Sequence, residues 1–308
     1  MPHDDRHGNH HHHVDPDAGE TRLVWAVVVN VGLTVAQVIG GILSGSLALI
    51  ADALHNFSDA VSLIIAVLAR RIARRPADAA MSFGYGRAEI VAALVNYTTL
   101  TVLALYLIYE GIMRALNPQP IDGWLVVWIA VAALVVDLVT AALTLAMSRS
   151  SMNIRAAFLH NLADALGSVG VIVAGTAVII WEWVWVDPVV TLMIAAYILW
   201  HVKAEIGGVI RILMLGSPPH LDTGKIISAI RDLPGLDDVH HVHVWQMQEH
   251  RAALNTHLVI EPGMWGQADA IKDAVKTDLR DRFGICDTTI ELECAVHACR
   301  GAAQIGDP

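Results

Sequence analysis

Six long apolar segments leave this chain few ways to fold. They run over residues 23–43, 47–69, 89–113, 124–147, 156–181 and 188–215. In a helix that rises 1.5 Å per residue, each segment is long enough to cross a bilayer core about 30 Å thick. Because that core holds no water to bond backbone groups, only helices and closed barrels can span it. Segments this long predict a bundle of six transmembrane helices.

Composition agrees with an integral membrane protein that carries a modest soluble part. The 308 residues have a mean hydropathy of +0.52, and only 16% are charged. The formal net charge of −10 argues against a nucleic-acid partner. All three cysteines follow residue 285, so they form no disulfide framework and fit a reducing compartment.

The first 21 residues are polar and rich in histidine. This composition excludes a cleavable signal peptide and predicts a disordered tail that binds metal loosely. A partial purification tag is the alternative, although the four consecutive histidines lie among Asp and Gly residues.

Loop charges predict the orientation in the membrane. Arginines gather on one side, at positions 70, 71, 74, 75 and 87 in one loop and 149 and 155 in another. Lys and Arg mark the cytoplasmic side of membrane proteins, so both termini are expected in the cytoplasm. Trp181, Trp183 and Trp185 then fit an aromatic belt at the outer surface. We expect a bacterial inner (plasma) membrane protein.

A heptapeptide occurs twice inside the apolar segments. Residues 54–60 read LHNFSDA and residues 159–165 read LHNLADA. Residues four apart share one helix face, so His55 pairs with Asp59 and His160 with Asp164. Two such helices facing each other supply two nitrogens and two oxygens, a full tetrahedral set for a zinc-like ion. Helix-packing contacts are the alternative, but they explain a duplicated pair poorly.

Another acidic residue, Asp137, lies in the fourth segment. A charge in contact with lipid is unstable, so Asp137 is expected to face protein or water.

After residue 215 the composition becomes that of a small soluble α+β domain. The pattern predicts a helix capped by Asp222 over 222–233, strands over 239–247 and 253–260, a helix over 265–283 and a last strand over 287–294. The predicted organisation is a tail (1–21), a transmembrane domain (22–215), an α-β-β-α-β domain (216–300) and a short tail (301–308).

Four stretches of the sequence are distinctive: GGILSGSLALIADALHNFSD (40–59), SFGYGRAE (82–89), HNLAD (160–164) and VHHVHVW (239–245). Together they resemble the cation diffusion facilitator family, in its zinc-transporting branch. The resemblance covers nearly the whole chain after residue 20. It implies a homodimer, not an enzyme, that exports Zn²⁺ from the cytoplasm in exchange for protons. It also implies six spans followed by a metallochaperone-like cytoplasmic domain in the order read above.

The resemblance assigns the transport site to His55, Asp59, His160 and Asp164. Histidine at position 55 points to zinc, because family members with Asp there tend to accept cadmium as well. From ligand types alone Co²⁺, Ni²⁺ and Cd²⁺ stay open. In the cytoplasmic domain the resemblance places His240 and His257 at ligand positions, and we expect them to form a second zinc site, structural or regulatory, with Glu293. No organic cofactor is expected.

Two departures from the family pattern matter. Relatives with a zinc site in the loop between the second and third spans carry an Asp and two histidines. This chain keeps Asp78 but has Met81 and Tyr85, so we expect that site to be absent or weak. The last strand has Glu291 and Glu293 where some relatives have His and Asp; alternation places both on one face.

Ordinary strand surface remains the alternative for His240 and its neighbours His241 and His243. The tail from Cys294 to Cys299 offers thiolate and imidazole ligands at short spacing, but we interpret it as solvated.

Three other functions compete with transport. An intramembrane metallohydrolase needs an open coordination position and a general base, and four protein ligands leave no such position. A channel favours weak binding at several sites over one tight site. A membrane metal sensor that binds zinc without transporting it is the strongest alternative, but a sensor does not need a site inside the bilayer.

Overall fold

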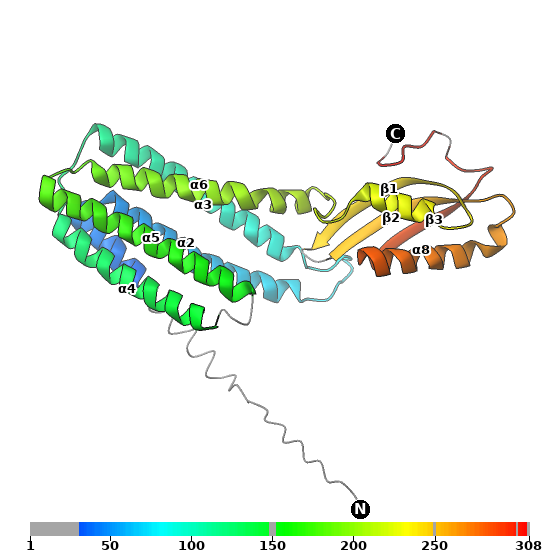
Figure 1. Ribbon diagram of the computed structural model, residues 1–308, viewed down its shortest axis with the longest axis horizontal. Helices are drawn as coiled ribbons and strands as arrows, with labels where there is room; N and C mark the ends of the chain where they lie inside the picture. Colours follow the sequence, from blue (N-terminus) through cyan, green and yellow to red (C-terminus); the bar gives the residue numbers. More distant parts are fainter. Residues whose placement is uncertain (1–30, 148–151, 249–250, 300, 307–308) are drawn as a thin grey trace, which may run out of the picture. The chain divides into compact units, whose positions relative to one another are not determined.

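The computed structural model describes residues 31–147, 152–248, 251–299 and 301–306, without the side chains of residues 63, 143–147 and 152–161. The histidine-rich tail and the arginines at positions 149 and 155 therefore lie outside the described side chains. Figure 1 shows the chain coloured from the N-terminus to the C-terminus.

The chain divides into two compact units. Among described residues, the first contains 31–63, 100–147 and 152–199, and the second contains 64–99, 200–248, 251–299 and 301–306. Helices α2, α3 and α6 each contribute residues to both units. The predicted boundary between residues 215 and 216 stays a prediction.

The described residues before position 214 are mainly helical, as predicted. The helices are a segment over Val31–Ser44, then α2 (Leu47–Ala73), α3 (Ala88–Leu116), α4 (Gly123–Met147), α5 (Met152–Trp181) and α6 (Val186–Leu213). Within the described ranges, five helices are long and apolar enough to cross a membrane. Val31–Ser44 is the described part of the first predicted span.

A buried carboxylate fixes the start of α2. Asp187, at the start of α6, accepts hydrogen bonds from the Ser46 hydroxyl and from the backbone N–H groups of Leu47 and Ala48. The Ser46 hydroxyl in turn accepts from the N–H of Leu49 at 3.1 Å. The first N–H groups of a helix have no partner within it, and an anion there also stabilises the helix dipole. Asp187 thereby positions the helix that carries the first heptapeptide.

Helices α4 and α5 pack closely through small residues. A Cβ atom on Gly175 would lie 2.9 Å from the Val127 side chain, and one on Gly123 would lie 2.7 Å from the Gly175 carbonyl. Glycine lets helix backbones approach where apolar burial gives little driving force, as inside a membrane. This contact anchors α5, which carries the second heptapeptide.

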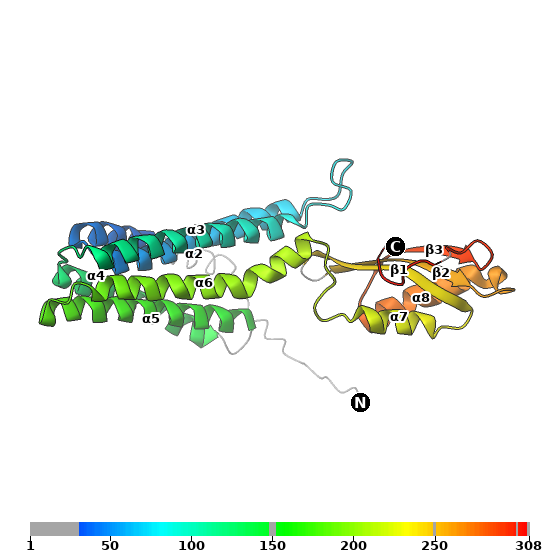
Figure 2. The same ribbon diagram turned by 90° about the horizontal axis from the view of Figure 1, so that it is seen from above.

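The C-terminal part is an α+β domain, as predicted. Its elements are α7 (Thr223–Arg231), β1 (Leu236–Gln248), β2 (Arg251–Ile260), the short 3₁₀ helix η2 (Trp265–Gln267), α8 (Ala268–Phe283) and β3 (Asp287–Cys294). The sheet order is β1-β2-β3, with β1 antiparallel and β3 parallel to β2. Figure 2 shows α7 and α8 on the same face of this sheet.

The core of this domain lies between that face and the two helices. Ile226 and Ile230 of α7 pack with Leu254 and Leu258 of β2 and Val275 of α8, all buried. Fully burying one such side chain stabilises the fold by about 1.5–3 kcal/mol. Asp222 caps α7 as predicted, accepting from the N–H groups at positions 224 and 225.

Candidate metal centres

The first candidate centre joins α2 and α5 within the first unit. His55 Nε2 lies 3.7 Å from an Asp59 carboxylate oxygen and 3.4 Å from an Asp164 oxygen. Asp59 is one helical turn after His55, whereas Asp164 comes from the other heptapeptide. The structure therefore brings three of the four predicted transport-site residues together, with one ligand atom of each within 4.8 Å of the others.

These separations suit a tetrahedral zinc ion. Zinc bonds to nitrogen and oxygen of 2.0–2.1 Å place neighbouring ligand atoms about 3.3 Å apart. The observed 3.4 Å and 3.7 Å are close to that value. Only 12% of the His55 side chain and 11% of the Asp164 side chain are exposed, so an ion held here would be largely shielded from solvent.

The fourth predicted ligand, His160, lies in α5, but its side chain is outside the described residues. Its backbone position is one helical turn before Asp164, which places both residues on one face of α5. The quartet is thus described for His55, Asp59 and Asp164, and the ligand role of His160 stays a prediction.

An aromatic ring covers one side of this centre. Tyr197 of α6 packs edge-on against His55, with the ring centroids 6.3 Å apart and the planes at 87°. An edge-to-face contact restrains the imidazole orientation.

A buried polar network lies one turn along α2 from His55. Gln37 donates to Asp52 at 2.7 Å, and the Ser168 hydroxyl lies 3.4 Å from Asp52 and 3.1 Å from Asp137. Asp137 is 9% exposed and faces protein, which confirms the prediction for this residue. The network links Val31–Ser44, α2, α4 and α5, so it holds the two ligand-bearing helices in register.

The second candidate centre lies on the sheet of the C-terminal domain. His240 of β1 pairs with His257 of β2, and the β1 register shifts between His240 and His243. His241 sits in this bulge with a φ of 50°, which is uncommon for a residue other than glycine. Consecutive strand residues normally point to opposite faces. The bulge instead gathers the rings of His240, His241 and His257, with centroids 4.9–5.4 Å apart.

Carboxylates and a thiol complete this centre. Glu293 approaches His257 Nδ1 at 2.7 Å and His240 Nε2 at 3.3 Å, and Glu291 lies 3.3 Å from His257 Nε2. Cys299 has its ligand atom within 4.8 Å of those of the three histidines. His240 is 2% exposed, and its Nε2 makes no hydrogen bond. A buried ring nitrogen beside a carboxylate, in a cluster that includes a thiol, fits a metal ion.

Two residues of this centre, Glu293 and Cys299, have shifted pKa values when no metal is bound. Burial of Glu293 works to raise its pKa, but hydrogen bonds from the Cys299 N–H and from His257, with nearby His240, bring the pKa below its ordinary value. Glu293 is therefore ionised at neutral pH. Partial desolvation, and then the Glu293 and Glu291 carboxylates, raise the pKa of the Cys299 thiol. The thiol must lose its proton to bind metal.

The tail from Cys294 to Cys299 is largely solvent-exposed, as predicted, but it also contacts the sheet. Although Cys299 is exposed, its N–H donates to Glu293 at 3.1 Å. Farther along, the carbonyls of Ala303 and Gln304 accept from the N–H groups of His241 and Val242. The bulged edge of β1 leaves these N–H groups open to a partner, and the tail supplies it.

The loop between α2 and α3 uses Asp78 for its own structure. One Asp78 oxygen accepts from the N–H groups of Ala80 and Met81, and the other accepts from the Tyr85 hydroxyl at 2.7 Å. The Tyr85 bond, followed by the two backbone bonds, lowers the pKa of Asp78. Within the described residues, no metal-ligand group includes Asp78.

Sequence reasoning gave no role at the first centre to Asp52, Ser168, Asp187 and Tyr197, which lie around it. It left His241 open as ordinary strand surface and interpreted Cys299 as part of a solvated tail, whereas both have ligand atoms in the second centre. A carboxylate in an apolar helix was the available signal for Asp52 and Asp187. Partners from distant helices could not be read from spacing.

Comparison with known families accounts for nearly the whole chain. The family model described as "Cation efflux transmembrane domain" matches residues 23–214, and "Cation efflux protein, cytoplasmic domain" matches residues 218–295. With the helical region and the α+β domain, these matches define the class: an integral membrane protein that transports cations and is not an enzyme.

Bacterial relatives align along almost their full length. The "Cadmium, cobalt and zinc/H(+)-K(+) antiporter" of Bacillus velezensis is 32% identical, covering 94% of this chain and 93% of the relative. The "Metal cation efflux system protein CzcD" of Cupriavidus metallidurans is 33% identical, covering 96% and 94%. The "Zinc transporter ZitB" of Escherichia coli is 34% identical, covering 91% and 90%. The chain belongs to the cation diffusion facilitator family, in its zinc-transporting branch.

Proposed function

We propose that this protein exports Zn²⁺ from the cytoplasm in exchange for protons, through one site formed by His55, Asp59, His160 and Asp164. The convergence of His55, Asp59 and Asp164 from two repeated heptapeptides carries the proposal. A single heptapeptide would supply only two ligands, whereas two facing copies supply the four that zinc prefers.

The donor set favours zinc over other biological cations. Imidazole and carboxylate together suit Zn²⁺, whereas all-oxygen sets suit Mg²⁺ and Ca²⁺, and thiolates suit Cu⁺. Two aspartates also balance the charge of the ion, which lowers the cost of holding it at membrane depth. Cd²⁺, Co²⁺ and Ni²⁺ are secondary substrates on this proposal, in keeping with the cadmium and cobalt in the name of the Bacillus relative.

Protons exchange for zinc at the same residues. A histidine must be deprotonated to bind metal, so zinc binding releases protons. After zinc leaves outward, protons occupy the imidazole and carboxylate groups and return inward with them. Imidazole is suited to this exchange, because an unperturbed histidine titrates near neutral pH. Rocking of helices that exposes the site alternately to each side is the expected motion.

The proposed setting is the bacterial inner membrane, with both termini in the cytoplasm. The bacterial sources of the relatives and the arginines of the loop between α2 and α3 support it. We propose that residues 22–215 span the membrane, that residues 216–300 form the cytoplasmic domain, and that the protein works as a homodimer. Pairing would help a domain of about 80 residues, which is small for independent stability.

In the cytoplasmic domain, His240, His257 and Glu293 are proposed to hold a structural or regulatory zinc ion. The buried His240 Nε2 beside the ionised Glu293 supports this assignment. His241, Glu291 and Cys299 lie within ligand distance of the same region.

Zinc flux into sealed vesicles containing the purified protein tests the proposal. With equal zinc on both sides and an imposed pH gradient, zinc should accumulate in the vesicles, and a proton ionophore that collapses the gradient should abolish this accumulation. A channel would instead pass zinc down its own gradient whatever the pH. A sensor or a metallohydrolase would bind zinc without moving it, and either result would refute the proposal.

A further inference from the structure

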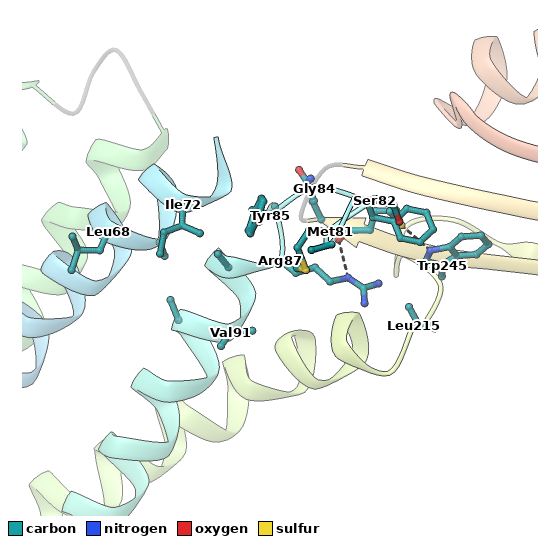
Figure 3. A pocket seen from close by; sticks show the side chains of 18 of the residues that line it. Leu68, Ile72, Met81, Ser82, Gly84, Tyr85, Arg87, Val91, Leu215 and Trp245 are labelled. Carbon is teal, nitrogen blue, oxygen red and sulfur yellow. Dashed lines mark hydrogen bonds between the residues drawn. The ribbon is translucent and has the colours of Figure 1, made fainter. Parts of the chain in front are cut away.

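The second unit contains an apolar pocket that the proposed transport function does not use. Its volume is about 870 Å³, within the range of ligand-sized cavities. Figure 3 shows Leu68 and Ile72 of α2 and Val91 of α3 on one side, and Leu215 and Trp245 on the other. The loop between α2 and α3 lies between these two walls.

That loop is unusually apolar at its surface. Met81 is 45% exposed and Phe83 is 72% exposed, and both line the pocket. They lie outside the segments that are apolar enough to cross a membrane. Exposed apolar side chains next to a cavity mark a place where an apolar ligand or surface is bound.

A basic pocket adjoins the apolar one and shares Gly86 and Gln248 with it. Its lining has the arginines Arg70, Arg74 and Arg251 against a single acidic residue, Glu89. Glu89 lies 3.7 Å from Arg70, and Arg251 is paired with Asp287 at 3.0 Å. The lining therefore keeps an excess of positive charge. Arg87, which lines the apolar pocket, adds another cation and donates to the Met247 carbonyl at 3.4 Å.

The position of the two pockets indicates which class of ligand they bind. Both are lined by the last turns of α2 and the first turns of α3, two helices long and apolar enough to cross a membrane. The pockets are therefore at the level where a bilayer ends and lipid headgroups begin. A ligand here needs an apolar chain and an anionic head.

We propose that these adjoining pockets bind an anionic phospholipid, with its phosphate at Arg70 and Arg74 and an acyl chain beside Leu68, Ile72 and Trp245. The loop residues Met81 and Tyr85, which line the apolar pocket, thereby serve a lipid site. The inference is independent of zinc transport, because none of these residues belongs to either candidate metal centre.

Native mass spectrometry of the full-length protein tests the charge requirement. Phosphatidylglycerol should bind in preference to phosphatidylcholine, and the pair Arg70→Gln/Arg74→Gln should weaken phosphatidylglycerol binding by roughly tenfold or more. Arg71→Gln/Arg75→Gln makes the same change of charge at the same end of α2 but outside both pocket linings, and it should leave binding nearly unchanged. Glu89→Gln should strengthen binding, because it removes the acidic member of the lining.

Fluorescence tests the acyl-chain position without relying on the arginine variants. Phosphatidylglycerol brominated on its acyl chain should quench the part of the emission that is lost in Trp245→Phe. Three results would overturn the proposal. They are an equal loss of lipid binding in the two double arginine variants, equal binding of the two lipids to the wild-type protein, and no quenching of Trp245. Absence of Trp245 quenching is the result expected if a second copy of the chain, and not a lipid, covers the pocket.

Discussion

At the scale of single residues, His55 is the centre of the proposed transport site. It approaches Asp59 along its own helix and Asp164 across from α5, while Tyr197 holds the ring edge-on. An imidazole nitrogen between two carboxylates is a zinc-type arrangement, and the identity of this donor should set the metal preference.

His55→Asp should therefore change selectivity more than activity. The variant keeps a ligand at this position but exchanges nitrogen for an anionic oxygen, so zinc flux should persist while discrimination against Cd²⁺ relaxes. Zinc and cadmium fluxes in the same vesicles give the ratio directly. An unchanged ratio would show that position 55 does not contact the ion.

Asp78 has a structural role within its own loop, where the family resemblance alone would suggest a metal ligand. Asp78→Ala should leave zinc affinity unchanged, because the carboxylate holds the loop through Tyr85 and two N–H groups. Equilibrium zinc binding to the purified protein checks this expectation. A lost high-affinity site would contradict it.

The same contact predicts a pH signature. The pKa of Asp78 is lowered in the folded loop, so ionised Asp78 stabilises the loop. This stabilisation is complete above the ordinary pKa of 3.8 and is lost only as the pH falls through the lowered pKa. Donation to Asp78 raises the pKa of Tyr85 above its ordinary 10.0. In Asp78→Ala the Tyr85 phenol should titrate at lower pH than in wild type, measured as the absorbance change absent from Tyr85→Phe. No shift would contradict the contact.

At the scale of elements, the start of α2 depends on a residue of α6. Asp187 is 1% exposed and binds three groups at the α2 N-terminus. Asp187→Ala should lower the free energy of unfolding by about 2 kcal/mol, through the loss of a buried, charged cap. It should also reduce zinc flux, because α2 carries His55 and Asp59.

Asp122→Ala is the matched control for this prediction. Asp122 caps α4 at 3.2 Å from the Leu125 N–H, but it is exposed, so its loss should cost less than that of Asp187. Thermal unfolding in one detergent compares the two variants. Equal melting temperatures would contradict a special role for Asp187.

Sequence patterns predicted the elements better than the partners between them. Segment length predicted the helices, because a bilayer permits few alternatives, and helical spacing predicted that His55 and Asp59 share a face. The regular alternation of side chains along a strand does not hold at His241, because the bulge of β1 turns its side chain toward those of His240 and His257. The place of Cys299 depends on a tail that folds back onto the sheet, and no local pattern encodes such a return.

At the scale of the whole molecule, the cytoplasmic domain should sense zinc separately from transport. If it binds zinc only when folded, zinc at a hundred times its dissociation constant should stabilise it by about 2.7 kcal/mol. His240→Ala should reduce the zinc-induced rise in melting temperature of the full-length protein. His243→Ala is the control, because His243 lies on the same strand but in neither metal-ligand group of the described residues. Equal rises in both variants would favour ordinary strand surface.

The central claim is that the two heptapeptides build one transport site. Zinc flux driven by a pH gradient in sealed vesicles, at matched protein levels, tests it with Asp59→Ala, Asp164→Ala and the double variant. Each single change removes a carboxylate that balances the ion, so each should reduce flux by more than about a hundredfold. The double variant should be no worse than either single variant, since the ligands act as a unit. Substantial flux in Asp164→Ala would contradict the shared site and return the second heptapeptide to a role in helix packing.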